Sequence, residues 1–293
     1  MKKKVIAMLL TSVLAVSMFA GCGSDEGTDS AADTQSSSQD SADEEEASDE
    51  ESAAPDTTYG TATEGKFVVG FDQEFPPMGF VGEDGEYTGF DLELAEEVAN
   101  RLGLEFVAQP ISWDAKDMEL SSGTIDCIWN GFTMTGREGE YTFSEPYLNN
   151  RQVFVVNESS DIQSTADLAG KIVEVQADSA AEAALNENTE LSSTFTMQAV
   201  PDYNTAMMDL EQGAVDAIAM DEVVASYQIT SRGSQFRVLD EEISSEEYAI
   251  GFLKGNDKLK DSVEGALQEM ADDGTLARIS EKWFGSDITT FGK

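Results

Sequence analysis

One short pattern occurs twice in the chain, ninety residues apart. Residues 120–128 and 210–218 share the form Leu-x-x-Gly-x-[Ile/Val]-Asp-x-Ile. Each copy predicts the end of a helix, a glycine turn and a buried strand, because glycine readily ends a helix and the residues after it are apolar. This spacing is too long for a solenoid repeat. The pattern therefore predicts two α/β lobes of related design.

A strand, a helix and a second strand are predicted at the start of the first lobe. Residues 66–72 form a mostly apolar run that predicts a buried strand, and residues 104–108 predict another. Between them, the apolar residues of 90–102 recur at helical spacing, and Gly103 supplies a stop. A strand–helix–strand unit of this size favours a parallel sheet.

Polar residues follow each of the two repeated strands. Residues 130–133 come after the first strand, and Asp221 comes after the second. Ligands of open α/β sheets bind beyond the carboxyl ends of the strands, so we expect these two ends to face a common cleft. Asp126 and Asp216 lie inside the turns themselves, where an aspartate usually bonds nearby backbone. We interpret both as structural.

Composition excludes several classes of function. The 293 residues include 58 acidic residues, 17 lysines and arginines and no histidine, which gives a formal charge of −41. Binding to nucleic acid needs a basic surface and is not expected. The absence of histidine removes Ser–His and Cys–His nucleophile pairs and nearly every zinc site, so we expect neither a metal nor a cofactor. The length suits two lobes, since single cores stop growing near ~250–300 residues.

The N-terminal segment predicts export and a lipid anchor. Three lysines and a short apolar run make residues 1–21 a signal peptide, too short to span a bilayer. Small residues directly before Cys22 resemble the lipobox of bacterial lipoproteins, in which this cysteine carries the lipid. Residues 22–65 contain 14 acids and no base, which predicts a disordered tether. Cys127 then has no disulfide partner, and we expect it to be buried and inert.

Motifs in the rest of the chain resemble the polar amino-acid-binding proteins of ABC importers, within the bacterial extracellular solute-binding proteins of family 3. The resemblance covers residues 66–286 and depends on motifs in a fixed order: Gly70-Phe71-Asp72 with Phe75-Pro76-Pro77, Gly89-Phe90-Asp91-Leu92, Thr133-Met134-Thr135 with Arg137, Phe143-Ser144-Glu145-Pro146-Tyr147, Val175-Gln176-Ala177-Asp178-Ser179, and Gly274-Thr275 with Glu281-Lys282-Trp283-Phe284-Gly285.

This resemblance implies the type II periplasmic binding protein fold, an α/β fold of two lobes. Each lobe would hold a mainly parallel sheet flanked by helices. Lobe one would comprise residues 66–150 and 248–293, and lobe two residues 151–247. The chain would cross between the lobes near residues 148–152 and 246–249, so that the two segments form a hinge.

The resemblance also implies roles for single residues. Arg137 would bind a ligand carboxylate through its planar fork, and Asp221 would bind the α-ammonium. Backbone N–H groups at a helix N-terminus would help to hold the carboxylate. Phe75 and Trp113 would enclose the ligand side chain, with Asp72 accepting a hydrogen bond at its tip. The implied ligand-binding residues are Asp72, Phe75, Trp113, Asn130, Gly131, Phe132, Thr133, Arg137, Ser179, Ala180 and Asp221.

Some residues keep two interpretations. Arg137 could be a solvated surface residue, and Phe75 and Trp113 could be core residues. Asp178 stands where the family usually has glycine, so its carboxylate could cap the following helix or repel a ligand. Capping is the favoured interpretation.

The function implied is capture of an amino acid, polar or basic, by an extracytoplasmic binding protein. The ligand would close the hinge, and the closed form would deliver it to a membrane permease with its ATPase. The protein would be a monomer, lipid-anchored on the outer face of the cell membrane, and not an enzyme. Two alternatives stay open: an amino-acid sensor or surface lipoprotein without transport, and an enzyme similar to cyclohexadienyl dehydratases, with a carboxylate or lysine as general acid.

Overall fold

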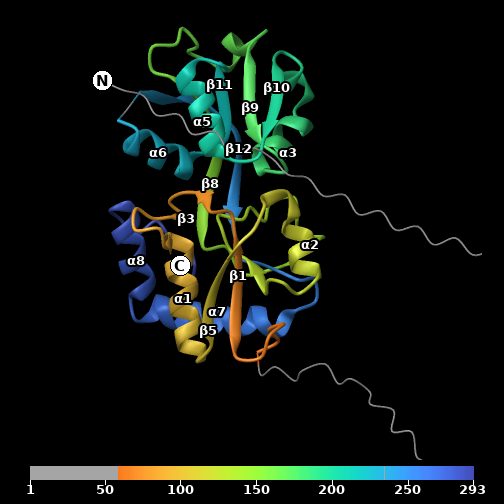
Figure 1. Cartoon of the computed structure of the whole chain (residues 1–293), viewed down its shortest axis with the longest axis vertical. Coiled ribbons are helices and arrows are strands. Elements are labelled where there is room, and N and C mark those ends of the chain that lie inside the picture. The colour runs from red at the N-terminus through yellow and green to blue at the C-terminus, as the bar shows by residue number, and fades with distance from the viewer. Residues whose placement is uncertain (1–58, 234) are drawn as a thin grey trace, which may run out of the picture. The chain divides into compact units, whose positions relative to one another are not determined.

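The computed structural model describes residues 59–233 and 235–293 (Figure 1). The expected signal peptide, the lipid-bearing Cys22 and most of the expected tether lie outside the described residues. Among the residues that are described, none of the helices is both long enough and apolar enough to cross a membrane.

Lobe one is built on a sheet of five strands in the order β5-β1-β6-β13-β7. β5, β1 and β6 are parallel, and β13 runs antiparallel to both of its neighbours. In Figure 1, α1 and α2 lie on opposite sides of β1. The strands are β1 (Lys66–Phe71), β5 (Glu105–Pro110), β6 (Cys127–Ile128), β7 (Thr142–Phe143) and β13 (Gly251–Phe252). The helices are α1 (Phe90–Leu102), η1 (Trp113–Ala115), α2 (Lys116–Ser121), α7 (Asp257–Asp272) and α8 (Thr275–Phe284).

A small three-stranded sheet also belongs to this lobe, and the sequence did not predict it. Its strands are β2 (Glu74–Phe75), β3 (Gly79–Val81) and β4 (Tyr87–Thr88). It occupies the connection between β1 and α1, where Phe75 is buried.

Lobe two repeats the arrangement with the order β10-β9-β11-β8-β12. Its first three strands are parallel, and β8 runs antiparallel to both of its neighbours. The strands are β8 (Leu148–Asn157), β9 (Ile172–Gln176), β10 (Thr196–Val200), β11 (Ala217–Asp221) and β12 (Phe236–Tyr248). The helices are η2 (Thr165–Leu168), α3 (Ala180–Glu187), α4 (Thr189–Ser192), α5 (Tyr203–Gln212) and α6 (Glu222–Ser231).

The two copies of the repeated pattern occupy equivalent places in the two sheets. In lobe one, Asp126 accepts a hydrogen bond from the backbone N–H of Val68 at 2.7 Å. In lobe two, Asp216 accepts one from the backbone N–H of Ile172 at 2.9 Å. Each aspartate thus ties its own turn to the neighbouring parallel strand. This confirms that both are structural and extends the repeat from sequence to hydrogen bonding.

Helix α1 has the bounds that its apolar spacing predicts. Its buried face includes Phe90, Leu94 and Val98, and Gly103 ends the helix in the left-handed conformation at φ 69°. Glycine adopts this conformation without the steric cost that a Cβ would bring. The following strand begins at Glu105, one residue later than predicted.

Two paired strands connect the lobes. β8 leaves lobe one and β12 returns to it, and they pair antiparallel with Leu148 opposite Tyr248. Figure 1 shows them side by side between the two sheets. The fold class expected from the sequence, two α/β lobes joined by a two-segment hinge, is therefore confirmed.

The packed part of the chain begins before residue 65, where the tether was expected to end. Tyr59 packs against the core of lobe one, and Thr61 is buried. The backbone N–H of Ala62 donates to Asp126 at 2.6 Å, and the carbonyl of Gly60 accepts from Asn256 at 3.1 Å. Residues 59–65 therefore pack on lobe one, because they supply both an aromatic ring and backbone groups that it can bind.

Cys127 lies on β6 inside the core of lobe one and is fully buried. Burial raises the pKa of its thiol well above the usual range, because the thiolate would lose its hydration there. An unreactive cysteine, as expected, is the consequence.

Candidate ligand-binding site

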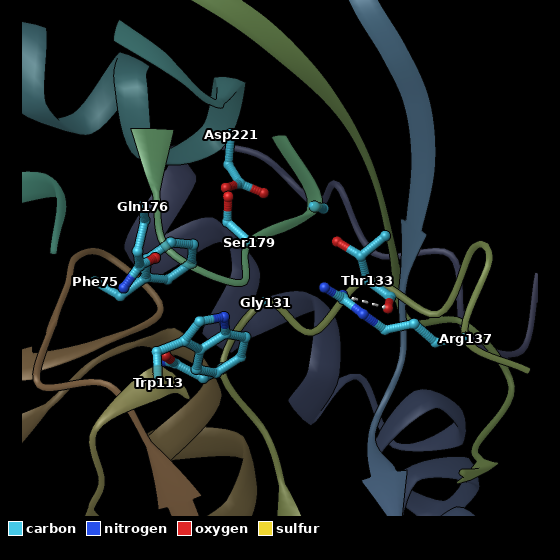
Figure 2. Close-up of a pocket in the computed structure, with 10 residues that line it drawn as sticks. Phe75, Trp113, Gly131, Thr133, Arg137, Gln176, Ser179 and Asp221 are labelled. Atoms are coloured by element: carbon cyan, nitrogen blue, oxygen red, sulfur yellow. Dashed lines mark hydrogen bonds between the residues drawn. The ribbon is translucent and has the colours of Figure 1, made fainter. Parts of the chain in front are cut away.

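A cavity enclosing about 280 Å³ of space, part of it open to solvent, is lined by residues of both lobes (Figure 2). Nine of the eleven residues implied by the family resemblance line it, and Gln176 is an addition. The lining residues are Phe75, Trp113, Asn130, Gly131, Thr133, Arg137, Gln176, Ser179, Ala180 and Asp221. The two implied residues that do not line it are Asp72 and Phe132.

The loop after β6 forms the floor of the cavity in lobe one. Gly131 has φ 57°, and a Cβ there would come within 3.0 Å of ring carbons of both Phe75 and Tyr248. Only glycine fits this position for both reasons. Its N–H donates to the buried carboxylate of Asp91 at 2.6 Å. Burial raises the pKa of Asp91 to about 7. Asp91 thus fixes the loop from behind without lining the cavity.

Arg137 is held at the edge of the cavity by backbone carbonyls. Its Nη1 donates to the carbonyl of Thr133 at 3.1 Å, and its Nη2 donates to the carbonyl of Asp178 at 3.4 Å. The guanidinium carbon lies 5.1 Å from the ring centroid of Phe132, a cation–π distance. Phe132 itself is fully buried. Its ring packs against the guanidinium of Arg137, and its side chain does not line this cavity.

The N-terminus of α3 faces the same cavity from lobe two. Ser179 is the N-cap, and its hydroxyl accepts from the N–H of Glu182 at 3.1 Å. The expectation that Asp178 caps this helix is wrong. Asp178 instead adopts φ 59° and directs its carboxylate across the cleft to the buried ammonium of Lys116. Its carbonyl accepts from Trp113 Nε1 at 3.2 Å.

Asp221 ends β11 and is buried. Its Oδ1 accepts from the Tyr248 hydroxyl at 2.5 Å, from Gln152 at 2.8 Å and from Asn150 at 2.9 Å. Burial raises the pKa of Asp221, although the hydrogen bonds oppose this effect. Figure 2 shows its carboxylate directed toward Ser179. It is the only carboxylate among the ten lining residues.

A second acid lies directly behind Asp221. Glu246 is 6 % exposed, and its Oε1 accepts from Asn150 at 2.6 Å and from Gln152 at 2.8 Å, the two amides that also bind Asp221. Burial and the neighbouring charge of Asp221 raise the pKa of Glu246 to about 8. No sequence motif pointed to Glu246, because its role depends on the pairing of β8 with β12.

Acidic residues lie behind the lining at the other end of the cavity. Gln176 donates to Asp72 across the lobes at 2.6 Å, so Asp72 stands directly behind the lining rather than in it. The pKa of Asp72 is raised to about 6. Burial is the main cause, and the nearby charges of Asp202 and Glu74 add to the increase. Glu74 in turn accepts a hydrogen bond from Asn204 of lobe two. Phe75 and Trp113 line the space in front of these groups.

Gln176 belongs to one of the motifs that resemble the family, but no pattern in the sequence assigned it a role. Its side chain could be placed only once the ends of β1 and β9 were known to meet across the cleft. No group of three or more metal-ligating side chains gathers within residues 59–233 and 235–293.

Together, two related lobes, a paired-strand hinge and a polar cavity between the lobes define a solute-binding protein of the type II periplasmic fold. A family comparison agrees with this class. The chain belongs to the bacterial extracellular solute-binding proteins, family 3, whose sequence profile matches residues 67–286.

Individual relatives are similar over most of the chain. The L-cystine-binding protein TcyJ of Escherichia coli K12 is 35% identical over 228 residues, which are 77% of this chain and 85% of that protein. The L-cystine-binding protein TcyA of Bacillus subtilis 168 is 29% identical over 295 residues, 99% of this chain and 100% of that protein. A histidine-bound substrate-binding protein of an ABC uptake transporter from Streptococcus pneumoniae superposes with a TM-score of 0.76 at 35% identity, covering 80% of this chain and 97% of that one.

One similar structure bears on the enzyme alternative. An ancestral amino-acid-binding protein, AncCDT-1, described as a precursor of cyclohexadienyl dehydratase, has a TM-score of 0.69 at 29% identity and covers 75% of this chain and 96% of that one. The family itself and the relatives above are binding proteins.

Proposed function

We propose that the chain captures a polar or basic amino acid between its two lobes and delivers it to the permease of an ABC transporter. One observation carries the proposal: the cavity presents a guanidinium from lobe one and a carboxylate from lobe two. These are the charges complementary to the carboxylate and the ammonium of an amino acid. A ligand of only one charge would leave Arg137 or Asp221 without its partner.

The carboxylate of the ligand binds between the lobes. Arg137 offers two parallel N–H donors, which suit a carboxylate better than a point charge does. The N–H group of Ala180 at the start of α3 adds the positive end of a helix dipole, whereas the N–H of Ser179 donates to the carbonyl of Gln176 at 3.3 Å. The Thr133 hydroxyl lines the same part of the cavity. The ammonium binds Asp221.

The distal end of the cavity selects the side chain. Asp72, Glu74 and Asp202 gather there, and Gln176 is the polar group that reaches the cavity. Negative charge at this end favours a ligand that carries a donor or a second ammonium, and it repels a side-chain carboxylate. Histidine, which is bound in a solved relative, carries a side-chain N–H donor, and cystine, for which two relatives are named, carries a second ammonium beside its second carboxylate.

Ligand binding drives closure in this proposal. The ligand contacts Arg137 and Thr133 from lobe one and Ser179 and Asp221 from lobe two, so only the closed form makes both sets of contacts. A ligand shifts the equilibrium toward the form that it binds more tightly. The hinge strands β8 and β12 bend, while each sheet moves as a unit.

The chain's place in the cell follows from the N-terminal sequence. A cleaved leader before Cys22 supports a lipid-anchored protein on the extracytoplasmic face of the membrane. Permease and ATPase subunits are its partners for transport, and the protein works as a monomer without catalytic activity. Sensing without transport uses the same cavity and differs only in the partner.

A thermal-shift screen tests the proposal. We expect at least one polar or basic amino acid from a panel of the twenty amino acids, cystine and ornithine to raise the melting temperature, since a ligand at ~1,000 times its Kd adds about 4 kcal/mol to the free energy of unfolding. Aspartate and glutamate serve as matched controls and should give no shift. A flat response across the whole panel contradicts the proposed function.

A further inference from the structure

Asp221 and Glu246 form a buried pair of acids that the binding of an amino acid does not by itself explain. We call them the hinge carboxylate pair. Asp221 ends β11 in lobe two, whereas Glu246 lies on β12 in the return segment of the hinge. Asn150 and Gln152, from the outgoing hinge strand β8, bridge them, because each amide nitrogen lies 2.6–2.9 Å from an oxygen of both acids.

These distances place the two acids close together. The two N–H bonds of one amide diverge by about 120°, so the bridged oxygens are separated by roughly 5 Å or less. Asp221 is 4 % exposed and Glu246 is 6 % exposed. Within residues 59–233 and 235–293, neither acid forms an ion pair with a lysine or arginine. Two buried carboxylates this close do not both ionise without a cation, because each disfavours the charge of the other.

The other charged or titratable groups around the pair do not replace such a cation. Arg151 is paired with Glu222 at 2.6 Å. Arg137 donates to backbone carbonyls. The hydroxyls of Tyr203 and Tyr248 have pKa values well above the usual range, because both are buried, and they stay neutral. Tyr203 of α5 and Tyr248 of β12 lie close to both acids. The charged groups that line the surface hollows bordered by Glu246 are Glu187 of α3, Arg151 of β8, Glu222 of α6, Glu247 of β12 and Arg137 of lobe one.

We propose that the hinge carboxylate pair holds one proton in the ligand-free protein and that the ammonium of the ligand expels it, so that Glu246 makes ligand capture dependent on pH. The proposal rests on the proposed function, since it requires an ammonium at Asp221. The O–H bond of the pair breaks, and its proton passes to water. The pair changes from a charge of −1 to −2, and the ammonium adds +1, so the net charge of the buried site is unchanged. Glu246 acts through Asp221 and is a positioning residue.

The hydrogen bonds at Asp221 explain why a ligand ammonium must compete with the proton of the pair. The Oδ1 of Asp221 already accepts from Asn150, Gln152 and Tyr248, so a fourth donor has to use Oδ2. A protonated Glu246 and a ligand ammonium are both such donors. The pKa of Glu246, raised to about 8, agrees with a pair that holds most of one proton at pH 7.

Calorimetry of the wild-type protein tests the proposal with the best ligand from the amino-acid panel. Titrations at pH 7 in buffers of different ionisation enthalpy count the protons released on binding. We expect release of between about 0.5 and 1 proton, and an affinity that rises by up to ~10-fold per pH unit between pH 6 and 7.5, because the slope equals the number of protons released. Binding without proton release, or an affinity that falls with pH in this range, overturns the inference.

Variants assign the proton to the pair. Glu246→Gln keeps the shape but has no proton to lose, so we expect its proton release to fall close to zero and its affinity to lose the pH dependence. The exposed neighbour Glu247 supplies the matched control, and Glu247→Gln should keep the wild-type release. Wild-type release in Glu246→Gln overturns the inference.

One measurement requires neither a ligand nor a variant that folds correctly. The carboxyl carbon of Glu246 in the ligand-free wild type, followed by ¹³C NMR, should titrate above pH 6, and titration below pH 5 contradicts the proposal. A ligand that binds without releasing a proton refutes only this inference. If nothing in the panel binds, the proposed function fails, and the inference fails with it.

Discussion

Arg137 is one of few cations in a strongly acidic chain, and it lines the cavity in which we propose that it binds the ligand carboxylate. It lies over the buried ring of Phe132 and donates to two carbonyls, one in each lobe. These contacts restrict the guanidinium before a ligand arrives. A group held in this way loses less entropy when it binds a carboxylate, so its contribution to affinity is larger than that of a mobile surface arginine.

Replacing Arg137 by alanine tests its role directly. We expect Arg137→Ala to weaken amino-acid binding by at least ~2 kcal/mol, the scale for leaving the buried ligand carboxylate without its charged partner. Isothermal titration calorimetry measures this loss. Arg278→Ala, at an exposed position on α8, is the matched control and should bind as the wild type does. Equal affinity of Arg137→Ala and the wild type would remove Arg137 from the site.

At the residue scale, residue types follow from the sequence, whereas neighbours in space follow from the fold. The family resemblance implied that Arg137 and Asp221 bind opposite ends of a zwitterion, and both residues line one cavity. Gln176 and Glu246 carry no such signal. Their partners lie 104 and 96 residues away in the chain, and no local pattern connects them.

Among the elements, the start of α3 and the short helices η1 and α2 form a latch across the cleft. Lys116, at the start of α2, is only 2 % exposed and pairs with Asp178, whose side chain is 55 % exposed. Trp113 of η1 donates to the carbonyl of the same residue. These contacts join the lobes without a ligand. The ion pair of Asp178 with Lys116 therefore favours the closed form.

The asymmetry in burial predicts unequal effects of the two halves of this latch. Asp178→Asn leaves the ammonium of Lys116 buried without its charge partner, so we expect the closed form to lose about 2 kcal/mol and the ligand-free protein to open. Asparagine also tolerates the left-handed backbone at this position. Lys116→Met removes the buried charge and leaves only an exposed carboxylate, so it should open the protein less.

Small-angle scattering of the ligand-free variants checks this prediction. The radius of gyration should increase more for Asp178→Asn than for Lys116→Met, and an excess of ligand should restore the compact value in both. The latch has no such role if Asp178→Asn and the wild type scatter identically without ligand.

For the whole molecule, the dominant features are its negative charge and its buried acids. Residues 66–293 contain 44 acids and 14 bases. Burial raises the pKa of Asp72 to about 6, that of Asp91 to about 7 and that of Glu246 to about 8. Above the pKa values of the unfolded chain, near 4, the folded protein therefore holds more protons than the unfolded chain does. Its free energy of unfolding must fall as the pH rises through this range.

We therefore expect the ligand-free protein to be most stable near pH 5. Each extra proton in the folded state costs about 1.4 kcal/mol of stability per pH unit as the pH rises toward the raised pKa. Below pH 4 the trend reverses, because hydrogen bonds from Thr275 and Arg101 lower the pKa of Asp273 to about 2, and that stabilisation is lost in acid. Calorimetric melting temperatures at pH 3, 5 and 8 measure the loss of stability on both sides of this maximum.

A variant links this dependence to its cause. Between pH 5 and 8, the free energy of unfolding of Glu246→Gln should fall less steeply than that of the wild type, by about 1.4 kcal/mol per pH unit. Glu247→Gln should keep the wild-type slope. A wild-type melting temperature that rises from pH 5 to pH 8 would show that the buried acids do not control the stability.

The sequence by itself determined those features that depend on neighbours along the chain. Apolar spacing defined α1, glycines marked the turns, and the repeated pattern with Asp126 and Asp216 predicted two related lobes. The small sheet β2-β3-β4 escaped prediction because its strands are two or three residues long and carry no resolvable period. The order of motifs was sufficient to identify the family.

Only the tertiary structure decided which polar groups share a buried environment. Asp221 with Glu246, Lys116 with Asp178, and Asp72 with Gln176 each join segments that are distant in sequence. The ionisation of such groups depends on lost hydration and on the distance to the next charge, and both are properties of positions in space. The residue types in the cavity follow from the sequence, whereas their protonation and their partners follow from the closed arrangement of the two lobes.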